Sequence, residues 1–65
     1  MQDTDRKDHL LRRLADELAG EHLRLHRLAQ EANEAGCDPQ TVTRLLGAAE
    51  KVKQARQRVQ DRLPQ

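Results

Sequence analysis

The chain has 65 residues, of which 35% are hydrophobic and 35% are charged, yet its net charge is only +1. This length fits one domain with a marginal core, and Leu, Val and Ala must build that core because the sequence contains no Phe, Tyr or Trp. The near-neutral charge argues against a strongly basic nucleic-acid binder or an acidic tail. The composition therefore favours close packing of helices.

The cysteine count and the lack of long apolar runs limit the cellular environment and the kinds of site that the sequence suggests. Cys37 is the only cysteine, which excludes an internal disulfide and a four-cysteine metal site and fits a reducing, cytoplasmic environment. We interpret it as a small turn residue rather than a redox switch, because no neighbouring base or metal ligand in the sequence would activate its thiol. No apolar run approaches the ~18 residues of a membrane span, and no signal-like apolar segment follows Met1.

The first predicted helix runs from about residue 5 to residue 35. Thr4 or Asp5 is its candidate N-cap. Apolar residues then recur at three- and four-residue spacing, which is typical of a helix that faces a core. These residues are Leu11, Leu14, Leu18, Leu25, Leu28, Ala32 and Ala35.

A turn over residues 36–38 separates this helix from a second helix over about residues 39–63. Gly36 suits the left-handed position just after a helix end. Asp38 followed by Pro39 is the preferred pair for opening a helix, and Pro64 would stop it. The second apolar stripe consists of Val42, Leu45, Ala49, Val52, Val59 and Leu63.

Both stripes fit one heptad frame, which predicts the fold class. We expect an all-α protein, a single domain over residues 1–65, built as an antiparallel two-helix hairpin or coiled coil that dimerises into a four-helix bundle. Charge supports the hairpin, because residues 1–38 hold nine acids and six bases whereas residues 39–65 hold six bases and two acids. Dimerisation is expected because a lone pair of helices buries too little apolar surface to offset its ordering entropy.

Folding the chain at this turn sets Glu21, the only polar residue of the first stripe, opposite Arg56, the only polar residue of the second. We predict that the two form a buried ion pair that fixes the register of the helices, since a slip would leave a charge unpaired. The residues predicted for the core and its register are Leu14, Leu18, Glu21, Leu25, Leu28, Leu45, Ala49, Val52, Arg56 and Val59.

The apolar arc is wider than a two-helix seam can cover, which predicts a surface for a further helix. The residues expected there are Ala15, His22, Ala29 and Leu46. His22 and His26 lie one helical turn apart, a spacing able to hold a metal ion, but zinc requires three or four ligands and the neighbouring turns supply none. We therefore predict no metal site and interpret His22 as a half-buried contact with the partner.

Arg44, Lys51 and Arg58 recur every seven residues and form a basic strip on the second helix, extended by Arg62. Such a strip is suited to following phosphates. Solvated helix faces are often basic near their C-terminal ends, however, and no aromatic residues stand between these cations to stack on bases. Contact with nucleic acid is thus the less favoured interpretation.

No arrangement of residues indicates catalysis. The sequence has no Ser/His/Asp constellation and no glycine-rich phosphate loop, and a chain of this size offers no concave domain to enclose a substrate. We expect neither enzymatic activity, nor a cofactor, nor a small-molecule substrate.

Two resemblances concern the turn and the overall plan. The run from Gly36 to Leu46 resembles the hairpin between the last two helices of the all-helical chorismate mutases, and residues 25–57 can be aligned with it. That family's first helix, with its essential arginines, has no counterpart here, so the resemblance implies a shared helical turn. The overall plan is similar to that of small plasmid regulators of the Rop type, which dimerise as four-helix bundles and bind RNA hairpins.

These observations favour a non-enzymatic helical module for protein–protein interaction or assembly, expected to form a homodimer or to bind another helical protein. The first alternative is a small Rop-like regulatory protein that binds RNA through the basic strip. The second is a designed helical-bundle scaffold without an evolved task. Against a design, Gly20 and Gly47 interrupt helices at a cost of about 1 kcal/mol each relative to Ala.

Overall fold

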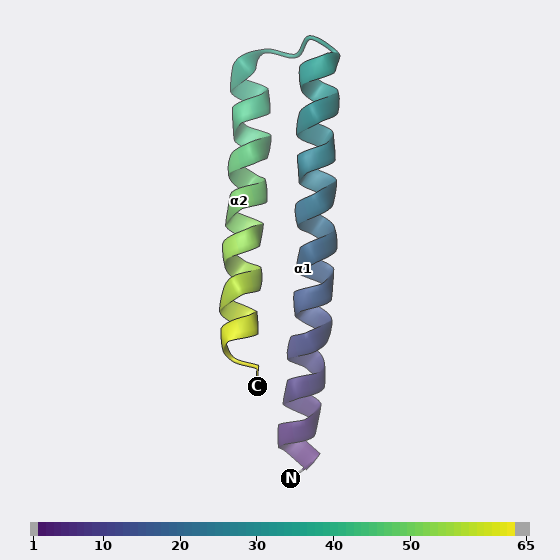
Figure 1. Cartoon of the computed structure of the whole chain (residues 1–65), viewed down its shortest axis with the longest axis vertical. Helices are drawn as coiled ribbons and strands as arrows, with labels where there is room; N and C mark the ends of the chain where they lie inside the picture. The colour runs from purple at the N-terminus through teal and green to yellow at the C-terminus, as the bar shows by residue number, and fades with distance from the viewer. Residues whose placement is uncertain (1, 64–65) are drawn as a thin grey trace.

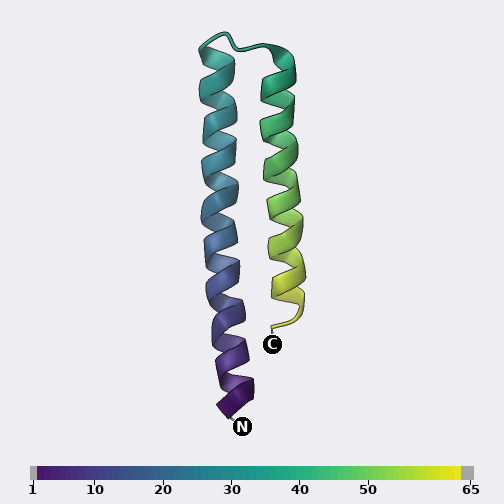
Figure 2. The same cartoon turned by 180° about the vertical axis from the view of Figure 1, so that it is seen from behind.

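The computed structural model describes the backbone of residues 2–63 and the side chains of residues 5–63. It contains two helices, α1 (Gln2–Glu34) and α2 (Pro39–Asp61), and no strand within the described residues. The helices lie side by side in opposite directions, and α1 extends past the C-terminal end of α2 (Figures 1 and 2). The predicted all-helical hairpin is confirmed.

The turn between the helices follows from its residue types. Gly36 has a positive φ of 79°, a conformation that side chains with a Cβ rarely adopt. The Cys37 amide donates to the Ala32 carbonyl at 2.9 Å and the Gly36 amide to the Asn33 carbonyl at 3.2 Å. These two bonds form the Schellman motif, which satisfies the carbonyl groups left free at the end of α1.

Asp38 then opens α2 as its N-cap. Its carboxylate accepts the Thr41 amide at 3.2 Å and the Thr41 hydroxyl at 2.7 Å, and Pro39 occupies the first turn. The hydrogen bond from the Thr41 side chain, followed by that from the Thr41 amide, holds the pKa of the Asp38 carboxyl below its ordinary value. These contacts fix the direction in which α2 leaves the turn.

The helix ends differ slightly from the predicted bounds. Because α1 begins at Gln2, both candidate N-caps, Thr4 and Asp5, lie inside the helix. α2 ends at Asp61 rather than near residue 63, and Arg62 caps it. Pro64 lies outside the described residues. Within those residues, neither helix contains a stretch apolar and long enough to cross a bilayer.

The seam between the helices differs from the predicted frame on the α1 side. Ala15, Ala29 and Ala49 are the buried apolar residues, with exposed fractions of 6%, 2% and 0%, whereas Leu14 and Leu28 are 38% and 43% exposed. The stripe that contains Leu18 and Leu25 has apolar neighbours on both sides, Leu14 and Leu28 on one and Ala15 and Ala29 on the other. The close approach of the two helices selects the smaller residues, so the prediction that Leu14 and Leu28 belong to the core was wrong.

This shift also overturns the predicted ion pair between Glu21 and Arg56. With Ala15, Ala29 and Ala49 in the seam and the turn at residues 36–38, the heptad spacing sets Ala32 opposite Val42 and Leu18 opposite Arg56; we call this pairing the seam order. Glu21 falls outside the seam, where the Arg24 guanidinium donates to its carboxylate at 2.7 Å. A pair of this kind near solvent avoids the desolvation cost of a buried pair, which explains why Glu21 binds the neighbour on its own helix.

Candidate interaction surface

One long side of the hairpin is mostly apolar, and we call it the apolar face. Its charged exception is Glu21, which lies one heptad from both Leu14 and Leu28 and pairs with Arg24. In the observed heptad frame, Leu18 and Leu25 of the seam lean toward the same side as Leu14 and Leu28. On α2, alanines flank the seam on that side. The apolar face consists of Leu14, Leu18, Leu25 and Leu28 of α1 and Leu45, Ala48, Val52, Ala55 and Val59 of α2.

The residues of the apolar face remain accessible to solvent. Leu14 and Leu28 are exposed, and the other seven are only half-buried. No large side chain of the described residues is fully buried. Folding into a hairpin thus leaves much of the Leu and Val surface in contact with water, which is the situation that a second helical layer would relieve.

The opposite side of the hairpin is polar by comparison. Its flanking positions hold Ala19, His26 and Asn33 on α1 and Leu46, Lys53 and Gln60 on α2. Near the turn, a shallow apolar groove of about 160 Å³ is lined by Ala29, Gln30, Asn33, Val42 and Leu46. Small-molecule pockets usually hold about 300 Å³ or more, so this groove does not support a substrate site.

The four residues predicted for a partner surface occupy other places. Ala15 and Ala29 are buried against α2, so the prediction that they contact a partner was wrong. His22 lies half-buried in the seam, and its Nδ1 is 3.0 Å from the Ala49 carbonyl. Leu46 is 43% exposed, but on the groove side, away from the apolar face.

His22 and His26 are adjacent, with ring centroids 5.0 Å apart in an edge-to-face arrangement. The contact between His22 and the Ala49 carbonyl gives its imidazole a structural role, since it joins α1 to the backbone of α2. Among residues 5–63, no third His, Cys, Asp or Glu gathers with the pair to hold a metal ion. The two rings therefore form a packing contact.

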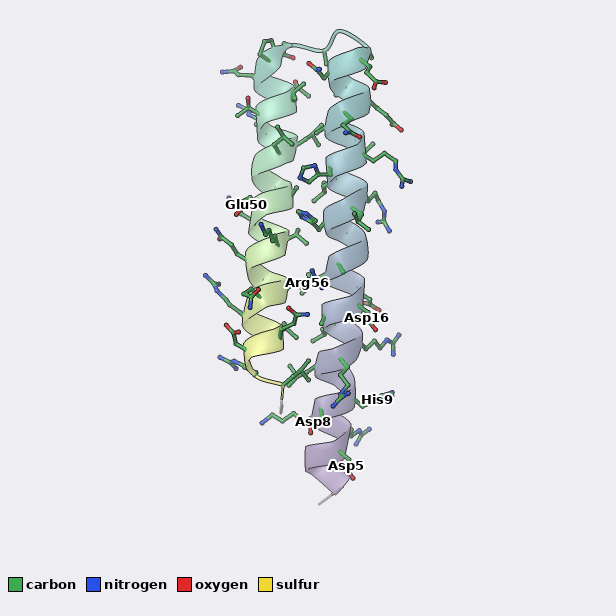
Figure 3. The ribbon with its side chains drawn as sticks, viewed as in Figure 1. Asp5, Asp8, His9, Asp16, Glu50 and Arg56 are labelled. Atoms are coloured by element: carbon green, nitrogen blue, oxygen red, sulfur yellow. The ribbon has the colours of Figure 1, made fainter. Side chains whose placement is uncertain are left out.

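Arg56 carries the least satisfied polar group of the seam. Its side chain lies between the two helices (Figure 3), and its Nε is buried without a hydrogen-bond partner. A buried donor left unpaired costs about 1–3 kcal/mol. The hairpin tolerates this cost at a position where the aliphatic part of the side chain fills the seam.

The charged residues beside the apolar face differ in sign between the helices. The basic strip, Arg44, Lys51, Arg58 and Arg62, is exposed to solvent. Within the described residues the ion pairs are Arg13–Glu17 and Arg24–Glu21, so the strip takes part in neither. On α1, Glu17 and Glu31 hold the equivalent positions, three residues after Leu14 and Leu28. They are two heptads apart, and Arg24 occupies the heptad position between them.

Comparison of the chain with protein-family models, with curated proteins and with solved structures finds no match.

Proposed function

We propose that the chain is a non-enzymatic helical assembly module that forms a homodimeric four-helix bundle through its apolar face, in a reducing, cytoplasmic environment. The observation that carries the proposal is the burial pattern: three alanines are buried, while every leucine and valine of the apolar face keeps contact with solvent. Exposed apolar faces of this extent mark interaction sites.

The size of the face agrees with a stable dimer. The 23 residues of α2 give a shared length of about 35 Å at 1.5 Å per residue, and two helices side by side are about 20 Å wide. The product is roughly 700 Å² per copy, close to the ~800 Å² per partner of a standard interface. A second copy would thus bury enough apolar surface to stabilise a hairpin that is marginal by itself.

Sedimentation equilibrium combined with circular dichroism over a protein concentration series tests the proposal. We expect a dimer whose helicity and melting temperature rise with concentration. Leu28→Glu, alone or with Leu14→Glu, should shift the protein to monomer, because it would add an unpaired charge to an interface whose one charge on that row, Glu21, is paired with Arg24. Leu23→Glu is the matched control, since Leu23 is 64% exposed and lies away from the apolar face. A monomer at all concentrations, or equal effects of Leu28→Glu and Leu23→Glu, would contradict the proposal.

The alternative function, RNA binding, draws support from the exposed basic strip, which takes part in no ion pair within the described residues. It predicts that a fluorescent RNA hairpin binds with steep salt dependence and that Arg58→Ala weakens the binding. Binding of this kind by a protein that stays monomeric would favour the regulator over the assembly module.

A further inference from the structure

The charges that border the apolar face specify how a second copy lies on it. Glu17 and Glu31 border the face along α1, with Arg24 between them held by Glu21 at 2.7 Å. Arg44, Lys51 and Arg58 border it along α2. One long edge of the face is therefore mainly acidic and the other entirely basic.

A symmetric second copy can cover the face in two ways. A two-fold axis parallel to the helices sets both turns at the same end and lays α1 of each copy over α2 of the other. A two-fold axis across the helices sets the turns at opposite ends and lays α1 over α1 and α2 over α2. Neighbouring helices are antiparallel in both arrangements, so the helix dipoles do not distinguish them.

The edge charges do distinguish them. With the turns at opposite ends, the basic edge of α2 would face the basic edge of the second copy, and like charges across an interface oppose association. With the turns at the same end, the two acids of the α1 edge face the basic edge of the second copy, while Arg24, neutralised by Glu21 at 2.7 Å, lies level with Lys51. The seam order, with Ala32 opposite Val42 and Leu18 opposite Arg56, then brings Glu31 level with Arg44 of the second copy and Glu17 level with its Arg58.

We propose that two copies dock with their turns at the same end, α1 of each on α2 of the other, with Glu17 and Glu31 facing Arg58 and Arg44 of the second copy. This inference rests on the proposed self-association and adds its orientation. It assigns the basic strip to the rim of the dimer, where Glu17 is free to change partner because its exposed pair with Arg13, at 3.4 Å, contributes little.

Cys37 provides a direct measurement of the orientation, because it is exposed and stands in the turn. Each chain carries one nitroxide label on Cys37, and pulsed electron–electron double resonance measures the distance between the two labels of a dimer. With the turns together, two helical layers about 10 Å apart place the labels within roughly 25 Å. With the turns at opposite ends, the length of α2 separates them by about 35 Å or more.

The outcomes are distinguishable. A short distance in a sedimenting dimer supports the inference. A long distance in a dimer overturns the inference and leaves the proposed function intact. A protein that sediments as a monomer and shows no dipolar coupling overturns both.

Charge reversal tests the same contacts without a label. Reversal of both acids, Glu17→Lys with Glu31→Lys, should raise the dissociation constant about tenfold at low salt, since several exposed pairs of a few tenths of a kcal/mol are lost in the dimer. Adding Arg44→Glu and Arg58→Glu should restore it. The control is Glu34→Lys with Glu50→Lys, which changes the net charge equally at exposed positions outside the rim. Weakening no greater than in this control, or failure of the swapped variant to recover, would refute the contacts.

Discussion

Replacing Arg56 with methionine should stabilise the protein, although it removes the only charged residue of the apolar stripe of α2. In the seam, the Arg56 Nε is buried without a partner, a state that costs about 1–3 kcal/mol. Methionine keeps an unbranched apolar side chain in the same place and adapts to irregular gaps. Since an imperfect fit of the new side chain costs up to about 1.5 kcal/mol, we expect a net gain near 1 kcal/mol.

Such a gain should raise the melting temperature by about 4–8 °C for a domain of this size. Circular dichroism melts and urea titrations measure it, with both proteins at equal concentration because association contributes to apparent stability. Arg27→Met is the control, since Arg27 is exposed on α1 and its replacement should change the stability by no more than about 0.5 kcal/mol.

The same substitution also separates the observed seam from a buried ion pair. Because Glu21 is bound by Arg24 at 2.7 Å, the effects of Glu21→Gln and Arg56→Met should add within about 0.5 kcal/mol in a double-mutant cycle. A loss of more than about 1 kcal/mol in Arg56→Met, or a coupling of that size between the two positions, would refute this account of the seam.

Three further predictions concern the turn and the helix interiors. Gly20→Ala and Gly47→Ala should each stabilise the hairpin by about 1 kcal/mol, because an added Cβ meets nothing within 4 Å. Gly36→Ala should instead destabilise it, because Gly36 has a φ of +79°. Thermal melts of the three variants test this contrast, and a stabilised Gly36→Ala variant would contradict it. Ala49→Leu should cost about 1–3 kcal/mol by overpacking, because Ala49 is 0% exposed, whereas Gln54→Leu on the exposed side of α2 should be nearly neutral in urea titrations. The Asp38 cap should stabilise the fold fully above the ordinary carboxyl pKa of 3.8, and this contribution should be lost as the pH falls through the lower pKa of the folded state. The difference in stability between the wild type and Asp38→Ala should therefore shrink below pH 4. A difference independent of pH would show that the carboxylate does not act as the cap.

The sequence alone was sufficient for the helices and for the turn. Gly36, Asp38 and Pro39 act through their own backbone preferences and through bonds to residues three to five positions away, so their effect could be predicted without knowing what lies across the hairpin. The apolar stripe of α2 could be predicted as well, because Val42, Ala49 and Val52 have few apolar competitors beside them.

The tertiary structure decided which side of α1 faces α2. The same periodicity is satisfied by Leu14 and Leu28 on one side of the stripe and by Ala15 and Ala29 on the other. Periodicity alone therefore could not decide which pair faces α2. The choice came from the close approach of two helices, which small side chains permit. That choice moved Glu21 out of the seam, left the Arg56 Nε unpaired and gathered the larger apolar residues on one outer face.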